Sequence, residues 1–442
     1  MWTRRFALIL LAACSVSAFG AETLPAAAGL YPDLARLTLR QAADMFVERN
    51  RELQAARRNV EGAEADTLSA AARPNPVAAV NVSGLGPRNT TVNGVSATRY
   101  PDTIVSLSQT FERGNKRELR TEAAQFGVDA SRSDLADTLR LQQVVLADAY
   151  YALLFAQMRA RIAEDSALLF RRTMSAVELR LKAGDVAASD VSRIRVDALR
   201  AENEARLARA DLAKAQTALA YLIGAEAQAR RIVADDGWPA PTLPPESDPE
   251  SVLEHRADVQ AAVARLKAAE KRVGLARALR TRNVDLGVQY ENYREDTKNN
   301  TVGFTVSVPL FVNYYFEGEI ARAEVEYTAA QEDLGRVRAL ALGDIERSRA
   351  DLDAAAERAR RYDELLLKEA ERAAKGAELA YEKGASGVLE LLDARRTLYA
   401  SRIEAVGARA DYARALAAWL ASVGESPDAS GAAERAPVET PQ

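Results

Sequence analysis

The sequence predicts a mostly α-helical protein with a small β part, built from long antiparallel helical hairpins in an internally duplicated chain. Two tracts contain no proline, from Asp102 to Trp238 and from Leu310 to Ser426, and alanine, leucine, arginine and glutamate dominate both. Such a balance is typical of long packed helices. Beside each tract, apolar residues alternate with polar ones at period two, which predicts β-strands. Each half of the chain is therefore expected to contribute helices and a few strands.

The first twenty residues have the pattern of an export signal, with Arg4 and Arg5 before an apolar run and small residues after it. Two cleavage sites fit this segment. Cleavage after residue 20 suits ordinary signal peptidase, whereas Leu11-Ala12-Ala13-Cys14 has the form of a lipobox, in which case residues 1–13 are removed and Cys14 carries a lipid. We expect export, with lipid anchoring at Cys14 left open.

The composition excludes several classes of function. A net charge of −4 on 442 residues, without a polybasic run, gives no reason to expect a nucleic-acid partner. One Cys and one His, His255, cannot build a disulfide framework or a Cys/His metal cage within one chain. His255 is expected at the surface of a helix. We therefore expect no cofactor, no bound metal and no enzyme.

The two halves correspond at a nearly constant offset, which indicates an internal duplication. The pairs separated by 200 residues are Lys182-Ala183-Gly184 with Glu382-Lys383-Gly384, Ile223-Gly224 with Val423-Gly424, and Thr110-Phe111 with Leu310-Phe311. The expected organisation is a first repeat at 37–224, a proline-rich linker at 225–250, a second repeat at 251–424 and a disordered tail at 425–442.

Each repeat is expected to hold one long helix and two shorter ones. The long helices are placed at Arg117–Ala183 and Glu319–Lys383, and each would be roughly 100 Å long. The shorter helices, which have together about the length of the long one and could stack end to end beside it, are Thr38–Ala72, Ala187–Ile223, Pro249–Leu279 and Val388–Val423. Small and apolar residues at three- and four-residue spacing, as from Ile194 to Leu222, predict coiled-coil packing.

Two strands are expected in each repeat. In the second, Val284–Tyr290 and Val302–Leu310 alternate strictly and flank a polar loop at Glu295–Asn300; in the first, weaker versions around Val80 and Val105 flank a longer loop at Pro87–Pro101. In an exported protein this pattern is typical of an outer-membrane barrel, although a soluble protein could bury such hairpins against a helix. Four strands cannot close a barrel, so two copies supplying eight strands or three supplying twelve must associate.

At this point the chain resembles the TolC-like outer membrane factors, from about Leu37 to Gly424. The residues that carry the resemblance are Arg73-Pro74-Asn75-Pro76, Ser108-Gln109-Thr110-Phe111, Val308-Pro309-Leu310-Phe311 and the glycine turns at Gly184 and Gly384. The resemblance implies a homotrimer in the outer membrane, with a twelve-stranded transmembrane β-barrel and a periplasmic α-barrel. It also implies docking, at the two glycine turns, to a periplasmic adaptor (a membrane fusion protein) and an inner-membrane pump.

The segment Glu112–Arg117 resembles the strand-to-helix junction of the branch that serves cobalt-zinc-cadmium efflux. The alternative interpretation is a set of basic residues near lipid headgroups at a helix start. The segment thus favours heavy-metal cations as cargo without deciding it.

The second glycine turn carries residues that match the family's gate. Glu390 and Asp393, three residues apart on one helical face, match its acidic positions, and Asp190 matches the residue that holds a tyrosine, here Tyr381. Threefold symmetry would gather six carboxylates at a narrow end, where they attract cations. The chain departs from the pattern at Ser386, where members with an ionic latch have arginine.

These observations favour a passive export duct from the periplasm to the exterior, with no chemistry of its own. Three alternatives stay open: a drug-efflux duct or a type I secretion duct of the same fold, and an exported structural coiled-coil protein, which would have no use for alternating strands. An exported hydrolase is disfavoured because the sequence lacks a Gly-x-Ser-x-Gly elbow and a metal motif.

Overall fold

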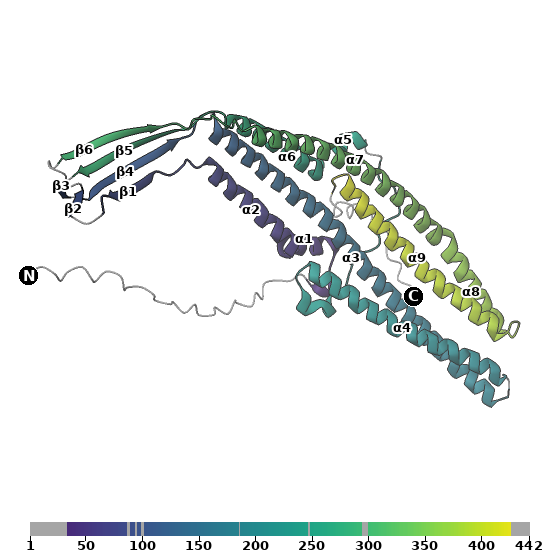
Figure 1. The fold of residues 1–442 in the computed structure, drawn as a ribbon. Helices are drawn as coiled ribbons and strands as arrows, with labels where there is room; N and C mark the ends of the chain where they lie inside the picture. The colour runs from purple at the N-terminus through teal and green to yellow at the C-terminus, as the bar shows by residue number, and fades with distance from the viewer. Residues whose placement is uncertain are drawn as a thin grey trace, which may run out of the picture.

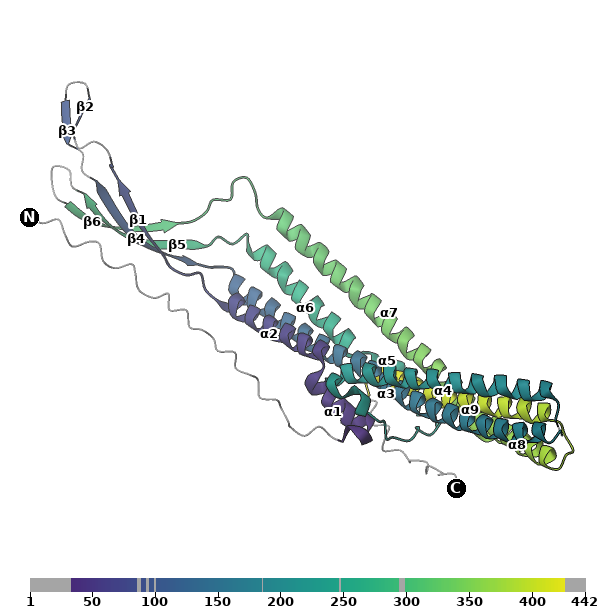
Figure 2. The ribbon, with the colours of Figure 1, turned by 90° about the horizontal axis from the view of Figure 1, so that it is seen from below.

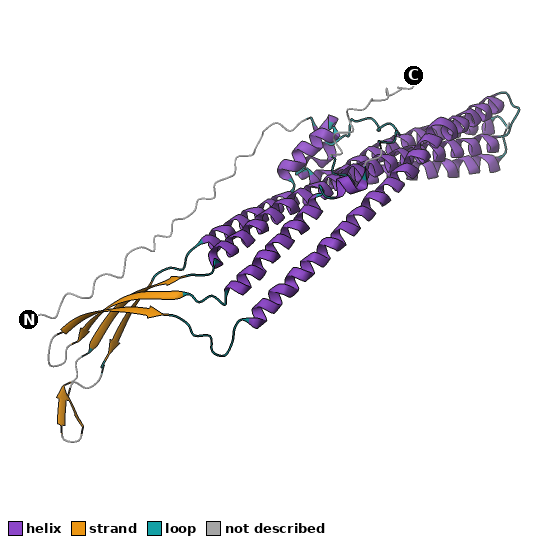
Figure 3. Ribbon diagram, turned by 90° about the horizontal axis from the view of Figure 1, so that it is seen from above, coloured by secondary structure: helices purple, strands orange, loops and turns teal. Residues whose placement is uncertain are grey.

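The chain forms an elongated molecule with a β-sheet at one end and a rod of helices at the other (Figures 1 and 3). This computed structural model describes residues 33–85, 89–92, 95–98, 101–184, 186–245, 248–293 and 299–425. The export signal with Cys14, the loop at 295–298 and the tail from residue 426 lie outside the described residues. The observed elements confirm the predicted fold class, with long helical hairpins, a small β part and two similar halves.

The first repeat contains four helices and the first two strands of the main sheet: α1 (Leu39–Arg49), α2 (Arg51–Ala71), β1 (Val77–Ser83), β4 (Asp102–Phe111), α3 (Lys116–Lys182) and α4 (Ala188–Leu222). The expected helix Thr38–Ala72 is wrong in one respect, because it breaks at Asn50. The backbone of Asn50 is extended (φ −64°, ψ 128°), and its side chain accepts a hydrogen bond from the amide of Leu53 at 3.0 Å. A buried asparagine cap thus restarts the helix in a new direction.

The second repeat contains α5 (Pro249–Leu253), α6 (Ala257–Ala278), β5 (Val284–Tyr293), β6 (Asn299–Ser307), α7 (Glu317–Arg361), a π-helical turn (Tyr362–Leu366), α8 (Leu367–Glu382) and α9 (Val388–Ser422). Two expectations need correction. The helix expected at Pro249–Leu279 is interrupted at residues 254–256, and the long helix expected at Glu319–Lys383 contains the π turn, whereas its counterpart α3 is a regular helix of 67 residues.

A third correction concerns the loop expected at Pro87–Pro101. It contains a small antiparallel hairpin of two strands, β2 (Asn89–Val92) and β3 (Val95–Thr98). The Asn and Gly residues that predict a loop in this segment are equally suited to the turn of a two-stranded hairpin.

Helix α3 is the central element of the rod. It packs against α2, α4, α6 and α9, so helices of both repeats share it (Figure 2). The expected end-to-end stacking is present: Gly224, after α4, lies against the side chain of Arg49 at the α1–α2 break. The largest apolar core lies at this level and includes Leu37, Tyr150 and Ile223.

The linker after α4 folds back into this core. Its residues Glu226–Arg231 form a 3₁₀ helix, and Ala234 pairs with Leu37. The hydroxyl of Tyr150 donates to Leu37 O at 2.9 Å and contacts Asp236 Oδ2 at 2.8 Å. Burial, together with the nearby Asp236 carboxylate, raises the pKa of Tyr150. The tyrosine therefore stays protonated and fastens the linker to α3.

Candidate functional site

The main sheet has the strand order β1-β4-β5-β6, antiparallel throughout. The register places most of its larger aliphatic and aromatic residues at equivalent positions on one face: Val80, Val82, Val105, Leu107, Leu286, Val288, Tyr290, Val302, Phe304 and Val306. The opposite face is mainly polar, with Val77 and Ile104 as exceptions, and its members include Ser106, Ser108, Asp285, Gln289, Glu291 and Thr305. The alternation predicted from the sequence thus holds across four strands.

The apolar face is open to its surroundings. Phe304 is 83% exposed, and Val302 and Val306 are exposed by about two thirds. The alternative that the hairpins are buried against a helix is therefore wrong. Strands β1 and β6 form the two edges, and each has a neighbour on one side only within the described sheet. Open edges and a bare apolar face are liabilities in water that association within a membrane removes.

At the opposite end of the rod, two tight turns join α3 to α4 and α8 to α9 (Figure 1). Gly184 (φ +84°) and Gly384 (φ +73°) both have the left-handed backbone that favours glycine. Their amides bond to Leu181 O and Tyr381 O, so both turns end their helices in the same way. The predicted tip turns are thus two versions of one structure.

The acidic residues predicted for a gate lie just past these turns. Glu390 stands in the first turn of α9, as Asp190 does in the first turn of α4, and Asp393 follows one turn later. Glu390 and Asp393 are exposed, while Asp190 is half-buried. Asp393 has a weak ion pair with Arg396, with 3.9 Å between Nη1 and Oδ1. The helix dipole favours carboxylates near a helix N-terminus, so both turns present negative charge where it is stabilised.

Tyr381 contacts a residue that sequence reasoning missed. Nη1 of Arg180 donates to the tyrosine hydroxyl at 3.0 Å, and the guanidinium lies 5.6 Å from the ring centroid. The expected pairing of Tyr381 with Asp190 is not among the contacts of the described residues. Nothing in the local sequence distinguishes Arg180 from other surface arginines, because the contact depends on the packing of one hairpin against the other.

Further contacts fix the two tip hairpins side by side. Nη2 of Arg396, on α9, lies 2.7 Å from both carboxylate oxygens of Asp197 on α4, and the Asp197 side chain is only 5% exposed. Arg395 donates to Thr173 Oγ1 on α3 at 2.6 Å. Leu392 is buried among apolar residues of the first hairpin. Such contacts make the tip a defined unit rather than two independent hairpins.

The departure at Ser386 has a structural consequence. Its hydroxyl oxygen is buried and has no hydrogen-bond partner within the described part of the chain, although its amide bonds to Ala380 O at 3.3 Å. An ionic latch from this position is therefore absent from the described structure, and Arg180, Arg395 and Arg396 supply polar contacts between the hairpins.

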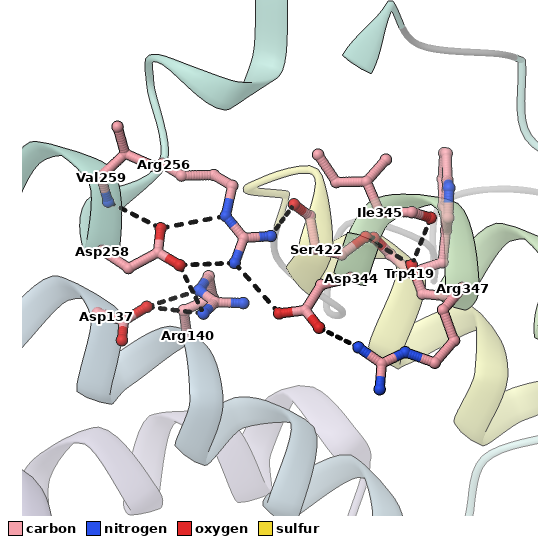
Figure 4. Close-up of polar contacts among 11 residues, drawn as sticks. Asp137, Arg140, Arg256, Asp258, Val259, Asp344, Ile345, Arg347, Trp419 and Ser422 are labelled. Carbon is pink, nitrogen blue, oxygen red and sulfur yellow. Dashed lines mark hydrogen bonds and ion pairs between the residues drawn. The ribbon is translucent and has the colours of Figure 1, made fainter. Parts of the chain in front are cut away.

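Midway along the rod, a buried arginine holds the end of α9 against the start of α6 (Figure 4). The side chain of Arg256 is 0% exposed; it donates to Asp258 Oδ2 at 2.7 Å and to Ser422 O at 3.0 Å. Asp344 of α7 lies 3.7 Å away and also pairs with Arg347. We call Arg256, Asp258, Asp344 and Ser422 the Arg256 joint.

Charges within the Arg256 joint compensate one another. Burial by itself would raise the pKa of Asp258, but hydrogen bonds from Arg256 and the charges of Arg256 and Arg140 hold it below its ordinary value. The neighbouring His255 is exposed, as expected, but lies in the turn before α6 rather than in a helix. The joint therefore has a structural role, since its polar groups contact one another.

The described part of the chain was also searched for metal sites and for membrane-spanning helices. No group of three or more His, Cys, Asp and Glu side chains is arranged to hold a metal ion there. Among the same residues, no helix has the length and apolar content needed to cross a bilayer.

Comparison with known proteins gives one family. The model of the outer membrane efflux protein family matches residues 42–225 and 249–425. The chain is 27% identical to the cobalt-zinc-cadmium resistance protein CzcC of Cupriavidus metallidurans over 383 residues, which span 84% of this chain and 86% of the relative.

Two solved structures have a similar fold. A membrane protein from Pseudomonas aeruginosa superimposes with a TM-score of 0.74 at 20% identity, covering 87% of this chain and 93% of that one. CusC, whose structures describe transmembrane channel formation, gives a TM-score of 0.75 at 19% identity and covers 88% of this chain and 92% of its own. These likenesses concern the fold.

Proposed function

Because the chain belongs to the outer membrane efflux protein family, we propose that it is the outer-membrane channel of a tripartite efflux system and conducts heavy-metal cations from the periplasm to the exterior. The family places the chain in the outer membrane with a helical stem in the periplasm. The metal cargo is supported by similarity to the cobalt-zinc-cadmium resistance protein. The duct itself performs no chemistry, and the energy comes from its partners.

The observation that carries this proposal is the four-stranded sheet with one bare apolar face and two open edges. In a bilayer the apolar face meets lipid, and the polar face lines water. The edges β1 and β6 pair with sister molecules, so that three chains supply a closed barrel of twelve strands. A structural coiled-coil protein would have no use for such a sheet.

The exposed carboxylates of Glu390 and Asp393 are proposed to line the narrow periplasmic end. Six carboxylates from three chains would concentrate cations and oppose anions there. The tip turns at Gly184 and Gly384 present the adjoining surface to a periplasmic adaptor, and the adaptor connects the channel to an inner-membrane pump.

Reconstitution of the purified mature protein into planar bilayers tests the duct. We expect discrete cation-preferring conductance, and cross-linking in detergent should stop at the trimer. Replacing Glu390 and Asp393 together by alanine should lower the cation-to-anion permeability ratio, whereas Asp353→Ala, on exposed α7 surface, should leave it unchanged. A protein that remains monomeric and water-soluble and never conducts would contradict the proposal.

The cargo is tested in the native host. Deletion of the gene should lower the tolerated concentration of cobalt, zinc or cadmium, and the wild-type gene should restore it. Increased sensitivity to drugs instead, or loss of a secreted protein, would assign the channel to the drug-efflux or type I secretion alternatives while leaving the duct itself intact.

A further inference from the structure

The connection between β6 and α7, residues 308–316, exposes an unusual amount of apolar surface. Leu310 is 74% exposed and Val312 78%, and about half of Tyr314 and Tyr315 is exposed. In Figure 2 this connection arches away from the other strand-to-helix connections. We refer to it as the β6–α7 loop.

The loop continues the apolar face of the sheet. Val302, Phe304 and Val306 lie on that face in β6, and Val308, Leu310 and Val312 extend the same period-two series past the strand end. All three are exposed, so exposed apolar side chains follow the apolar face of β6 directly into the loop.

Two arginines stand at this border. Arg282 lies two residues before the start of β5, in the same alternation of the sequence as Val284 and Leu286. Arg280 donates to Tyr315 O at 3.1 Å, and the Arg282 guanidinium lies 5.5 Å from the Phe311 ring centroid. Both are exposed, and neither has an ion pair with a carboxylate of the described residues. Each can therefore accept an external anion.

Side-chain packing and hydrogen bonds within the β6–α7 loop give it a defined conformation. Phe316 packs edge-on against Phe311 with ring centroids 5.1 Å apart, and its backbone is left-handed (φ +64°), which is unfavourable for phenylalanine. The nearby carboxylates are exposed, and both bond within the loop: Glu319 accepts from the Tyr314 hydroxyl at 2.5 Å and Glu317 from the Tyr315 amide at 3.0 Å. Neither carboxylate forms an ion pair with Arg280 or Arg282 among the described residues, so the two arginines remain available.

We propose that the β6–α7 loop, with Arg280 and Arg282, is a phospholipid-binding site at the periplasmic surface of the outer membrane. Leu310, Val312 and Tyr315 enter the leaflet at the level of the glycerol backbone, and the two arginines bind headgroup phosphates. Tyrosine is favoured at this depth, and arginine forms bidentate bonds with phosphate. The inference rests on the proposed function, because the sheet must lie in the membrane for the loop to reach the leaflet.

Fluorescence quenching by brominated phospholipids measures the depth of the loop. Tyr315→Trp and Phe304→Trp are reconstituted separately in vesicles whose lipids carry bromine either near the headgroup or near the chain end. We expect the new indole of Tyr315→Trp to be quenched more by the shallow bromines and that of Phe304→Trp more by the deep ones. Leu179→Trp, at the exposed tip, serves as the control and should not be quenched; Trp238 and Trp419 give a constant background.

The outcomes separate the two proposals. Quenching at position 304 without quenching at position 315 would overturn the lipid site and leave the channel intact; it is also the result expected if a second copy of the chain covers the loop. Absence of quenching at both positions would remove the sheet from the membrane and end the proposed function as well.

The arginines are tested by the phospholipid that stays bound after extensive detergent washing, measured as phosphate per protein. Retention at this site should fall by about fivefold for each of Arg280→Gln and Arg282→Gln. Arg277→Gln is the matched control, because Arg277 is exposed on α6 but already paired with Glu324 at 2.7 Å. Equal retention in all variants, with the indole of Tyr315→Trp still quenched by shallow bromines, would overturn the phosphate contact.

Discussion

The two strand-to-helix junctions of the duplicated chain have different structures. In the first repeat, β4 passes into α3 through a short turn in which Gly114 (φ +78°) and Asn115 (φ +56°) adopt the left-handed backbone, and the buried Lys116 follows. In the second repeat, the left-handed residue is Phe316, and the longer connection before it is largely exposed.

The first junction contacts the other repeat, whereas the second is exposed to the surroundings. Nζ of Lys116 donates to Thr281 O and Asn283 Oδ1, both at 2.6 Å, and these acceptors belong to the second repeat. Burial lowers the pKa of Lys116, while the charge of Glu112 partly opposes that shift. The first junction therefore joins the two repeats, whereas the second presents apolar side chains and arginines outward. Duplication kept the helices and strands and changed their connections.

The two repeats also differ midway along the rod, at the starts of α6 and α2. We expect the largest change in stability there. Arg256 begins α6 where Asn50 begins α2. Arg256→Met should lower the free energy of unfolding by about 3–5 kcal/mol, because the partly buried Asp258 loses its nearest ion-pair partner and keeps only Arg140, 3.9 Å away. Asn50→Ala should cost about 1 kcal/mol, the loss of a helix cap. Urea denaturation followed by circular dichroism measures both, and equal losses would contradict the contrast.

Lys116→Ala should be the next largest change, at about 1–3 kcal/mol, since Thr281 O and Asn283 would lose their donor. Its counterpart Glu317→Ala, in the first turn of α7 and exposed, should change stability by less than about 0.5 kcal/mol. Thermal melts of the two variants, measured side by side, provide the comparison. A larger loss of stability for Glu317→Ala than for Lys116→Ala would show that the second junction, not the first, joins the repeats.

Unlike the two junctions, the two tip turns should lose the same amount of stability when their glycines are replaced by alanine. Gly184→Ala and Gly384→Ala would each cost about 1–2 kcal/mol, because alanine in the left-handed region is strained. No atom outside the immediate chain neighbours lies within 4 Å of the position that a Cβ would take at either glycine, among the residues that the structure describes, so backbone strain is the whole effect. Denaturant midpoints of the two variants should coincide, and Gly335→Ala, within α7, should be neutral or stabilising.

Tyr381→Phe should have the smallest effect, about 0.5–1.5 kcal/mol, because it removes one exposed hydrogen bond from Arg180 and keeps the ring below the guanidinium. Single-channel recording provides a second measurement: a looser tip should open more often. If Asp190→Asn increases opening while Tyr381→Phe does not, the tyrosine contact with Arg180 has no part in holding the tip.

Local patterns predicted most of the fold. Proline spacing and small-residue periodicity located α3 to within one residue at each end, and alternation assigned the faces of β5 and β6. The π turn at Tyr362–Leu366 and the break at Asn50 were missed, because both lie inside segments whose helical periodicity continues through them, and the Asn50 cap is a single-residue signal. Within the π turn, Asp363 forms an ion pair with Arg409 of α9 at 2.7 Å.

The turn geometry around the candidate site was predicted in part, whereas the gate role of its acidic residues stays a prediction. The glycine turns and the exposure of Glu390 and Asp393 can be predicted from the local sequence around each residue. The partner of Tyr381 cannot. Arg180 and Tyr381 come from different repeats, and only the docking of the two hairpins brings them together.

By itself, the sequence determined the length of α3 and the division of the sheet into an apolar and a polar face, because these depend on periodicities of a few residues within one segment. The duplication was also determined by the sequence, since it follows from the matched segments. Only the tertiary structure decided that α3 is shared by both repeats, that Arg256 is buried at a joint, and that the β6–α7 loop is exposed. Burial and pairing depend on which surfaces meet, and residues far apart in the chain supply those surfaces.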